Sequence, residues 1–261
     1  MKPDDRFFDV RLATTEADLL GAQRLRYRVF VEELGGDGAL VDHEARLERD
    51  RYDPEYRHLV LVDSRRDEGS LDHVVGVYRL LDESGAERIG RFYTEDEYDL
   101  TPLRTSGMRL LELGRSCVLA DYRGGTAMYH LWQGLAAEIQ RAGIEILFGV
   151  ASFHGTDVTA LAQPLSLLHH RHLAPPELRA RAVPEHFQTM DLLPPEQVDR
   201  RSAMLAVPAL IKAYLRLGGF VGEGAFVDHP FNTTDVLLVM QTNRVTERQR
   251  EIYTGKTRRA G

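Results

Sequence analysis

The sequence predicts an α/β fold in which a mixed central β-sheet is flanked by helices on both faces. Segments with strand character alternate with segments of helical periodicity, a pattern typical of a sheet covered by helices. The central strand segment, 110–119, passes through a glycine pair directly into a helical segment. Hydrophobic residues make up 43% of the 261 residues and charged residues 28%, a composition that supports a folded core.

The individual elements follow from local signals. Runs of β-formers indicate strands, and apolar residues at helical spacing indicate helices. Thr15 and Asp18 form a capping-box pattern at the start of the first helix, and Gly143 marks a helix end. Pro208 lies inside the last helical segment, so that helix is expected to start or bend there. In chain order, we expect strand 7–12, helix 17–34, strands 58–63, 74–81 and 110–119, helix 126–141, strand 144–152, helices 157–172 and 203–217, and strand 236–241.

Charge and cysteine content exclude several classes of protein. The formal net charge is −7, which disfavours a general nucleic-acid binder, since phosphate neutralisation requires a basic surface. Cys117 is the single cysteine, so no intrachain disulfide can form. No apolar run approaches the length of a membrane helix, and the first residues lack an apolar signal core. We therefore expect a cytoplasmic protein.

The loop between the central strand and its helix carries the clearest chemical signal. Gly124 and Gly125 follow Arg123 and precede Thr126. Glycines at this position expose backbone N–H groups at the positive end of the helix dipole, which favours a phosphate. An ordinary tight turn is the alternative interpretation.

Several motifs resemble a known superfamily, and the resemblance grows more specific along the chain. The strand–glycine loop–helix unit is similar to the GNAT N-acyltransferases. Four segments resemble the N-acyl-homoserine lactone synthases, a GNAT-like family that uses acyl-carrier protein: Arg24 to Phe30, Glu48 to Asp53, Arg79 to Leu81, and Glu112 to Arg115. Three later segments are closer to the ornithine-acyl-carrier-protein N-acyltransferases of ornithine-lipid synthesis: Phe148 to Asp157, His169 to Pro176, and Leu217 to His229.

This resemblance implies a GNAT-like domain over residues 1–243, followed by a polar basic tail over 244–261. It also implies transfer of a 3-hydroxyacyl group from the 4′-phosphopantetheine thioester of acyl-carrier protein, as co-substrate, to the α-amine of ornithine. The resemblance implies no metal or redox cofactor. The product, a lyso-ornithine lipid, is amphiphilic, and the basic tail suggests peripheral contact with the inner membrane. A lactone synthase, a non-catalytic module that binds acyl-carrier protein, and glutamine as the amine donor remain alternatives.

The resemblance implies four groups of site residues, each with a plain structural alternative. The catalytic candidates are Glu112 as base, Arg115 beside it across a bulge at Gly114, and Tyr214 as acid for the leaving thiolate. The acyl-pantetheine candidates are Cys117, Val118, Leu119, Arg123, Gly124, Gly125 and Thr126. The amino-acid-binding candidates are Arg28, Arg79, Glu48, Asp50 and Asp53. Arg171, Arg179 and Arg181 form a basic candidate docking patch for the acidic carrier protein. The alternatives are an ion pair for Glu112 and Arg115, a packed helix residue for Tyr214, an inert buried thiol for Cys117, and solvated surface for the charged groups.

Overall fold

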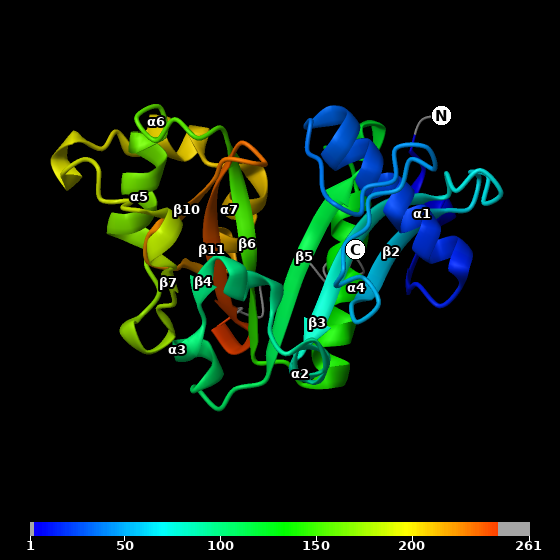
Figure 1. The fold of residues 1–261 in the computed structure, drawn as a ribbon, viewed down its shortest axis with the longest axis horizontal. Helices are drawn as coiled ribbons and strands as arrows, with labels where there is room; N and C mark the ends of the chain where they lie inside the picture. Colours follow the sequence, from blue (N-terminus) through cyan, green and yellow to red (C-terminus); the bar gives the residue numbers. More distant parts are fainter. Residues whose placement is uncertain (1–2, 245–261) are drawn as a thin grey trace, which may run out of the picture. The chain divides into compact units, whose positions relative to one another are not determined.

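The computed structural model describes residues 3–244 and divides them into two compact units. The first unit contains residues up to 90 and residues 113–143, and the second contains residues 91–112 and those from 144 onward. Each unit is therefore assembled from separate stretches of the chain (Figure 1). The basic tail expected over 244–261 lies, apart from Arg244, outside the described residues.

Four strands in the order β1-β2-β3-β5 form the sheet of the first unit. β1 and β2 pair antiparallel, as do β2 and β3, and the latter two confirm the strands expected over 58–63 and 74–81. The strands are β1 (Phe8–Leu12), β2 (Arg57–Asp63), β3 (Val74–Asp82) and β5 (Leu110–Val118), of which β5 gives only its residues from Leu113 onward to this unit.

Helices cover both faces of this first sheet, as the sequence predicts. On β2, Val60 and Val62 pack with α1 (Glu16–Arg26), whereas Leu59 and Leu61 lie against α4 (Ala127–Ala142). Alternate strand residues point to opposite faces, so α1 and α4 lie on opposite sides of the sheet. The short helix α2 (Glu83–Ile89) follows β3 directly.

The first helix begins and ends as its sequence signals indicate, but its second half has a different geometry. Thr15 caps α1 by accepting a hydrogen bond from the Asp18 backbone N–H at 3.1 Å. After Arg26 the helix continues as a π-helix, η2 (Tyr27–Glu33). The π geometry changes which side chains face the sheet and is common at functional sites.

The second unit contains a mixed sheet. β5 enters this sheet only through its first residues: Leu110, Leu111 and Glu112 pair in parallel with β6 (Ile146–His154). β6 pairs antiparallel with β11 (Thr233–Gln241) along the whole length of both strands. β11 then pairs with β10 (Ala225–Asp228) and β9 (Phe220–Val221), and β10 pairs with β8 (Phe187–Gln188). The remaining elements are β4 (Tyr98–Asp99) paired with β7 (Arg181–Ala182), and helices α3 (Thr101–Arg104), α5 (Ala162–His172), α6 (Arg200–Ala206) and α7 (Ala209–Arg216).

Two helix boundaries in the second unit correct the sequence prediction. The helix expected from residue 157 begins only at Ala162, because the Asp157 carboxylate accepts the N–H groups of Thr159 and Ala160 and holds a turn. The helix expected over 203–217 is two helices, α6 and α7, and Pro208 is the N-cap of α7. Proline has no N–H for an internal helix bond, so the chain restarts there.

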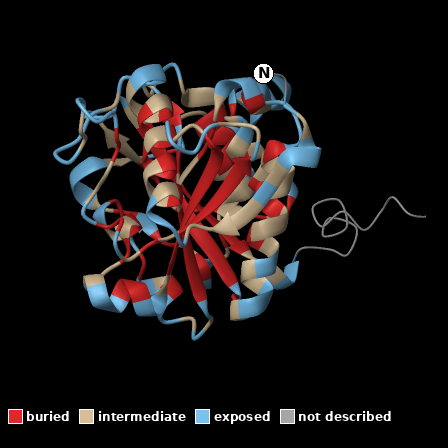
Figure 2. Ribbon diagram, turned by 90° about the vertical axis from the view of Figure 1, so that its right-hand side faces the viewer, coloured by how far each residue is buried: buried red, intermediate tan, exposed pale blue. Residues whose placement is uncertain are grey.

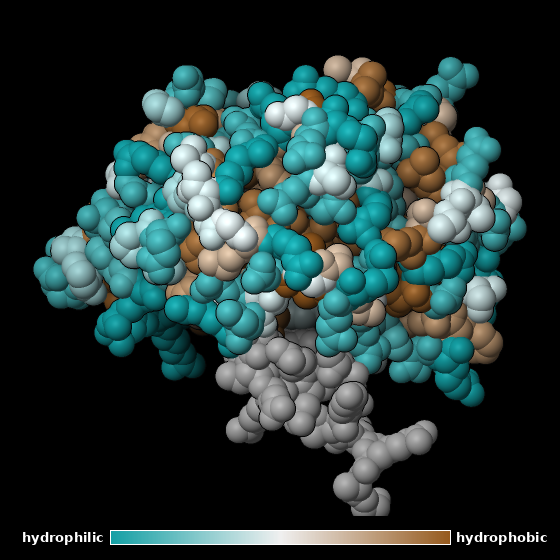
Figure 3. Space-filling view, turned by 90° about the horizontal axis from the view of Figure 1, so that it is seen from below, coloured by the Kyte–Doolittle hydropathy of each residue, from teal (hydrophilic) through white to brown (hydrophobic). Residues whose placement is uncertain are grey.

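Buried residues gather on the strands and on the sides of the helices that face them (Figure 2). Five large hydrophobic side chains are exposed among the described residues: Phe7, Leu34, Leu40, Leu205 and Phe231. On the face shown in Figure 3, hydrophobic residues form small groups among hydrophilic ones. Among the described helices, none has the length and apolar character needed to span a bilayer.

Candidate active site

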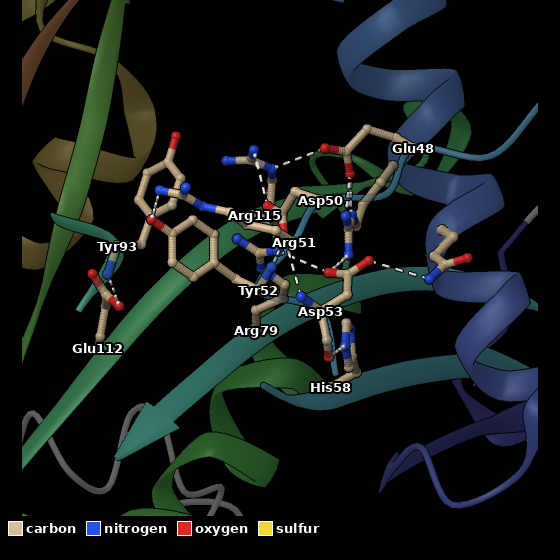
Figure 4. A network of polar contacts seen from close by, with 12 residues as sticks. Glu48, Asp50, Arg51, Tyr52, Asp53, His58, Arg79, Tyr93, Glu112 and Arg115 are labelled. Carbon is tan, nitrogen blue, oxygen red and sulfur yellow. Dashed lines mark hydrogen bonds and ion pairs between the residues drawn. The ribbon is translucent and has the colours of Figure 1, made fainter. Parts of the chain in front are cut away.

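A cluster of three arginines and three carboxylates occupies the first unit (Figure 4). We call it the Arg–acid cluster. Arg26 comes from the end of α1, Arg79 from β3 and Arg115 from β5. The carboxylates come from the acid-rich loop between η2 and β2. Its members are Arg26, Arg79, Arg115, Glu48, Asp50 and Asp53.

The two fully buried arginines make the close contacts of this cluster. Arg26 contacts Glu48 and places its Nη1 2.7 Å from Asp53 Oδ1. Arg79 Nη1 lies 2.6 Å from Asp50 Oδ2 and 2.8 Å from the same oxygen of Asp53 that Arg26 contacts. Asp53 therefore bridges two buried guanidinium groups. Such pairs persist in an interior only when each charge is compensated, as these are.

The arginines keep the neighbouring aspartates ionised. Burial alone would raise the pKa of Asp53, but Arg26 and Arg79 more than offset it and lower that pKa to about 2. Burial also opposes ionisation of Asp50, yet Arg79 and Arg115 hold the pKa of its carboxyl below the ordinary value. Three positive and three negative groups balance, so the cluster ties the loop to the sheet and offers no uncompensated negative charge.

Arg115 differs from the other two arginines because its side chain is partly exposed. Its side chain is 20% exposed, against 0% for Arg26 and 1% for Arg79. Its contacts are longer, 3.2 Å from Nε to Glu48 Oε1 and 3.4 Å from Nη2 to Asp50 Oδ2. The backbone of Arg115 has φ +49°, a left-handed conformation that costs energy for a residue with a side chain. The irregularity in β5 thus falls at Arg115, one residue after the glycine where the sequence suggested a bulge.

The structure brings together five of the residues that the sequence singled out, and it places Arg28 elsewhere. Glu48, Asp50, Asp53, Arg79 and Arg115 meet in the cluster. Arg28, on the π-helix, instead pairs with Asp72 at 2.6 Å and is not a cluster member.

Arg26 and Gln23 were not identified from the sequence. Gln23 donates to Asp53 Oδ2 at 3.2 Å. Arg26 lies at helical spacing from Ala22 and Val29, on the face of the helix that packs against the sheet. A charged residue in phase with an apolar stripe is the signal that would have found it, because such a residue must be paired when buried.

Glu112 lies in the second unit and is engaged by backbone groups. Its carboxylate accepts the N–H of Tyr93 at 3.1 Å and the N–H of Thr94 at 2.6 Å. These two residues open a short 3-10 turn, η3 (Tyr93–Asp96), whose first N–H groups have no partner within the turn itself. The Glu112 side chain is 1% exposed, so it anchors this turn from the interior.

The glycine loop is solvent-exposed and leads into the longest helix described. Gly124 has φ +74°, a conformation suited to glycine, and Thr126 is the N-cap of the 16-residue helix α4. Arg123 folds back, with Nε donating to the Val118 carbonyl at 2.8 Å and Nη2 donating to Glu33 at 2.6 Å. The loop backbone therefore faces solvent at the positive end of a helix dipole.

The residues that precede this loop make contacts and hydrogen bonds within the first unit. Cys117 packs in the core with Leu25 and Val29, and burial raises its pKa to about 12, so it behaves as an inert thiol. The Leu119 N–H donates to the Val75 carbonyl at 2.9 Å. That N–H is therefore engaged within the protein.

The remaining predicted residues are in the second unit. Tyr214 is buried on α7, and its carbonyl accepts the N–H groups of Leu217 and Gly219 in the turn that follows. In the predicted docking patch, Arg171 is exposed, Arg179 Nε donates to the Ala174 carbonyl at 2.8 Å, and Arg181 pairs with Glu223. Two of these three arginines, Arg179 and Arg181, therefore already contact groups of the protein.

Among residues 3–244, one group of side chains has a spacing that suits a metal ion: His169, His170 and Asp191. The sequence, in contrast, predicts no metal. His170 Nε2 lies 2.8 Å from the Leu193 carbonyl, which only accepts, so this nitrogen carries a proton. The geometry matches a hydrogen-bonded helix end.

Comparison with known proteins identifies the family. The chain is 61% identical to the L-ornithine N(alpha)-acyltransferase of Rhodobacter capsulatus over 254 residues, which cover 97% of each protein. It is 40% identical to the L-ornithine N(alpha)-acyltransferase of Brucella abortus, over 96% of this chain and 90% of that protein. The chain belongs to the L-ornithine N(alpha)-acyltransferase family. Residues 25–133 also match the acetyltransferase (GNAT) domain model, so the family is an acyltransferase family with a GNAT domain.

Solved structures confirm the GNAT-like fold predicted from the sequence. The CoA-dependent acyl-homoserine lactone synthase BjaI has a TM-score of 0.50 at 16% identity, over 92% of this chain and 82% of that one. The CoA-dependent acyl-homoserine lactone synthase MesI has a TM-score of 0.50 at 15% identity, over 97% of both chains. At these identities the likeness concerns the fold alone.

Proposed function

We propose that this protein transfers a 3-hydroxyacyl group from the phosphopantetheine thioester of acyl-carrier protein to the α-amine of L-ornithine. The observation that carries the proposal is the 61% identity to an L-ornithine N(alpha)-acyltransferase over 97% of the chain. The products are lyso-ornithine lipid and holo-carrier protein. In the reaction the amine nitrogen forms a bond to the thioester carbon, the carbon–sulfur bond breaks, and the thiolate takes up the proton lost by the amine.

Arg115 is the proposed ligand of the acceptor carboxylate. It is the most exposed arginine of the Arg–acid cluster, and its contacts to Glu48 and Asp50 exceed 3 Å. A guanidinium group can bind a carboxylate through two parallel hydrogen bonds. Arg79 and Asp53 position Arg115 indirectly, because Arg79 and Arg115 share Asp50.

The glycine loop is the proposed site of the pantetheine phosphate. The exposed backbone of Gly124 and Gly125 precedes the 16-residue helix α4, which favours a phosphate at its N-terminus. Exposed Arg171 is the best-supported residue for docking an acidic carrier protein, since Arg179 and Arg181 already contact protein groups. Tyr214 is kept as the candidate acid for the leaving thiolate.

The reaction needs only a small contribution from a general base that deprotonates the amine. An α-amine has a pKa of about 8, so its deprotonation at pH 7 costs about 1.4 kcal/mol. The Glu112 carboxylate accepts hydrogen bonds from two backbone N–H groups, which supports a positioning role more than direct proton abstraction. A base acting through water remains compatible with this demand.

The decisive experiment combines purified protein with 3-hydroxyacyl-carrier protein and a panel of amines, and detects products by mass spectrometry. The proposal predicts an N-acylated ornithine and a matching lipid in an expressing host. Parallel reactions with the acyl-CoA thioester test the carrier requirement. An N-acyl-homoserine lactone formed from S-adenosylmethionine, with no acylated ornithine, would replace the proposal with the lactone synthase alternative. Acyl-carrier protein binding without any product would indicate a binding module.

A further inference from the structure

The second unit carries a basic segment that spans α6 and α7. Residues 200–222 contain two arginines in α6, a lysine and an arginine in α7, and no aspartate or glutamate. Four basic and no acidic residues give this segment a formal charge of +4, in a chain whose net charge is −7. A positive region on an acidic protein attracts a negatively charged partner to that place.

Each of the two helices is held to the unit by one side, which leaves its other side outward. α6 packs against α5, and α7 packs against β11 (Figure 1). Ala203 and Val207 are the buried residues at α6. Leu205 lies about 200° around the helix from Ala203, at about 100° per residue. Its exposed fraction is 72%, the largest among the exposed large hydrophobic residues described above, so it stands out from the surface.

The basic residues surround Leu205 on this outward side. Arg201 and Leu205 are four residues apart, so their side chains are neighbours on the helix. Arg200, Arg201 and Arg216 are exposed. Lys212 Nζ donates to the Leu205 carbonyl at 3.3 Å, which brings its ammonium group to the C-terminal end of α6. We call this region the α6–α7 surface: Arg200, Arg201, Leu205, Lys212 and Arg216.

Two acids precede α6 along the chain and leave the balance of charge positive. Asp199 is the N-cap of the helix, and its carboxylate accepts the Arg201 N–H at 3.0 Å and the Ser202 hydroxyl at 2.6 Å. Glu196 is exposed in the short turn before it. Even when both acids are counted, the four cations of the surface outnumber them, so an anionic partner is still favoured.

An anionic lipid bilayer matches both properties of this surface. Basic side chains keep their charges at lipid phosphates while their apolar stems, and an apolar neighbour, lie against the acyl chains. A leucine that stands out from a helix enters a fluid lipid layer without a preformed cavity. A folded acidic partner would match the charges but would need a complementary cavity for this side chain.

We propose that the α6–α7 surface binds the anionic headgroups of a lipid bilayer, with Leu205 inserted between the lipids. This inference goes beyond the proposed function. It fits an amphiphilic product, which leaves the protein for a lipid layer. It is also separate from the basic tail expected over 244–261, because the residues that carry it lie in α6 and α7.

Sedimentation of the full chain with lipid vesicles tests the inference in the absence of substrates. The probes are vesicles of phosphatidylcholine alone and of phosphatidylcholine mixed with phosphatidylglycerol. We expect binding to the mixed vesicles only, weakened by salt. The double substitution Arg200→Glu and Arg201→Glu should lower the binding constant about tenfold or more. Leu205→Gln should lower it about tenfold, at high salt as well as low, because its contribution is apolar.

These variants should fold, and two matched variants serve as controls. Negative side chains are favourable in the first turn of a helix, where Arg200 and Arg201 lie. Leu40→Gln removes an exposed leucine of the first unit, and Arg109→Glu reverses an exposed arginine elsewhere in the second. Both controls should bind vesicles as the unmodified protein does. Every variant keeps residues 244–261, so any contribution of the tail is the same in all of them.

Three outcomes overturn the inference. The first is an unmodified protein that does not bind the mixed vesicles. The second is unchanged vesicle binding in the folded double variant or in folded Leu205→Gln. The third is a double variant with normal vesicle binding and a raised KM for acyl-carrier protein, because the surface then docks that acidic protein. The vesicle assay needs no catalysis, so failure of the proposed function is seen separately, as vesicle binding without any acylated ornithine.

Discussion

Replacing Asp235 by asparagine should stabilise the folded protein at neutral and alkaline pH. The side chain is buried, and among residues 3–244 no arginine or lysine pairs with it, so the ionised form is costly in the folded state. Asparagine keeps the shape and can still accept the Thr233 hydroxyl, which lies 3.2 Å from Asp235 Oδ2. The substitution thus removes the buried charge and retains the neighbouring hydrogen bond. A local cost of this kind is typical of functional sites, where stability is traded for activity.

The size of the effect follows from the pKa of Asp235. Burial raises that pKa from 3.8 to about 6 in the folded state. The folded state thus binds the proton more tightly than the unfolded chain, so the free energy of unfolding falls as the pH rises from about 4 to about 6. A difference of roughly two pKa units corresponds to about 3 kcal/mol above that window. At pH 5 the folded state is destabilised by about half of this 3 kcal/mol.

Thermal and urea unfolding at pH 8 and pH 5 measure the prediction. A gain of about 3 kcal/mol raises the Tm of a chain of this size by about 6–12 °C. We expect Asp235→Asn to show this rise at pH 8 and about half of it at pH 5, without ornithine in the buffer. Glu196→Gln is the control and should show no rise at either pH. A variant that is no more stable than the original protein at pH 8, or that gains equally at both pH values, would refute the reasoning.

Four further predictions concern the cluster, the turn and the carrier protein. Arg115→Ala should raise the KM for ornithine about tenfold or more and spare the KM for the acyl donor, whereas equal effects on both constants would argue against a carboxylate contact. Arg79→Met removes the buried guanidinium group shared by Asp50 and Asp53, leaving Asp53 with Arg26 and Asp50 with its longer contact to Arg115, so urea unfolding should show a loss of about 3–5 kcal/mol. Glu112→Gln places an amide donor against one of two N–H groups and should cost about 1–3 kcal/mol of stability. If Glu112 only positions the turn, raising the pH will not restore its turnover, whereas recovery at high pH would indicate a base. Arg171→Glu should raise the KM for acyl-carrier protein at low salt and leave the ornithine KM unchanged, and identical carrier KM values would exclude this docking residue.

Five residues of the Arg–acid cluster were predictable because each lies in a short segment that resembles a known family. The resemblance identified Glu48, Asp50, Asp53, Arg79 and Arg115 as site residues. It did not indicate how they pair. The contacts change how these residues are interpreted. The aspartates pair with Arg26 and Arg79, so their negative charge is already compensated within the protein. Pairing between residues 26 and 53 depends on packing of α1 against the sheet, which no local pattern specifies.

The sequence by itself determined the order of the main strands and helices, because hydrophobic periodicity, caps and prolines act over a few residues. Thr15 starts α1, Gly143 ends α4 and Pro208 separates α6 from α7 for such local reasons. Only the tertiary structure decided which charges are compensated. Asp53 and Asp235 are both buried aspartates, yet two arginines lower the pKa of Asp53 to about 2, whereas burial raises that of Asp235 to about 6. The difference arises from neighbours that are distant in the chain, and electrostatic interactions depend on distance and burial in the folded protein.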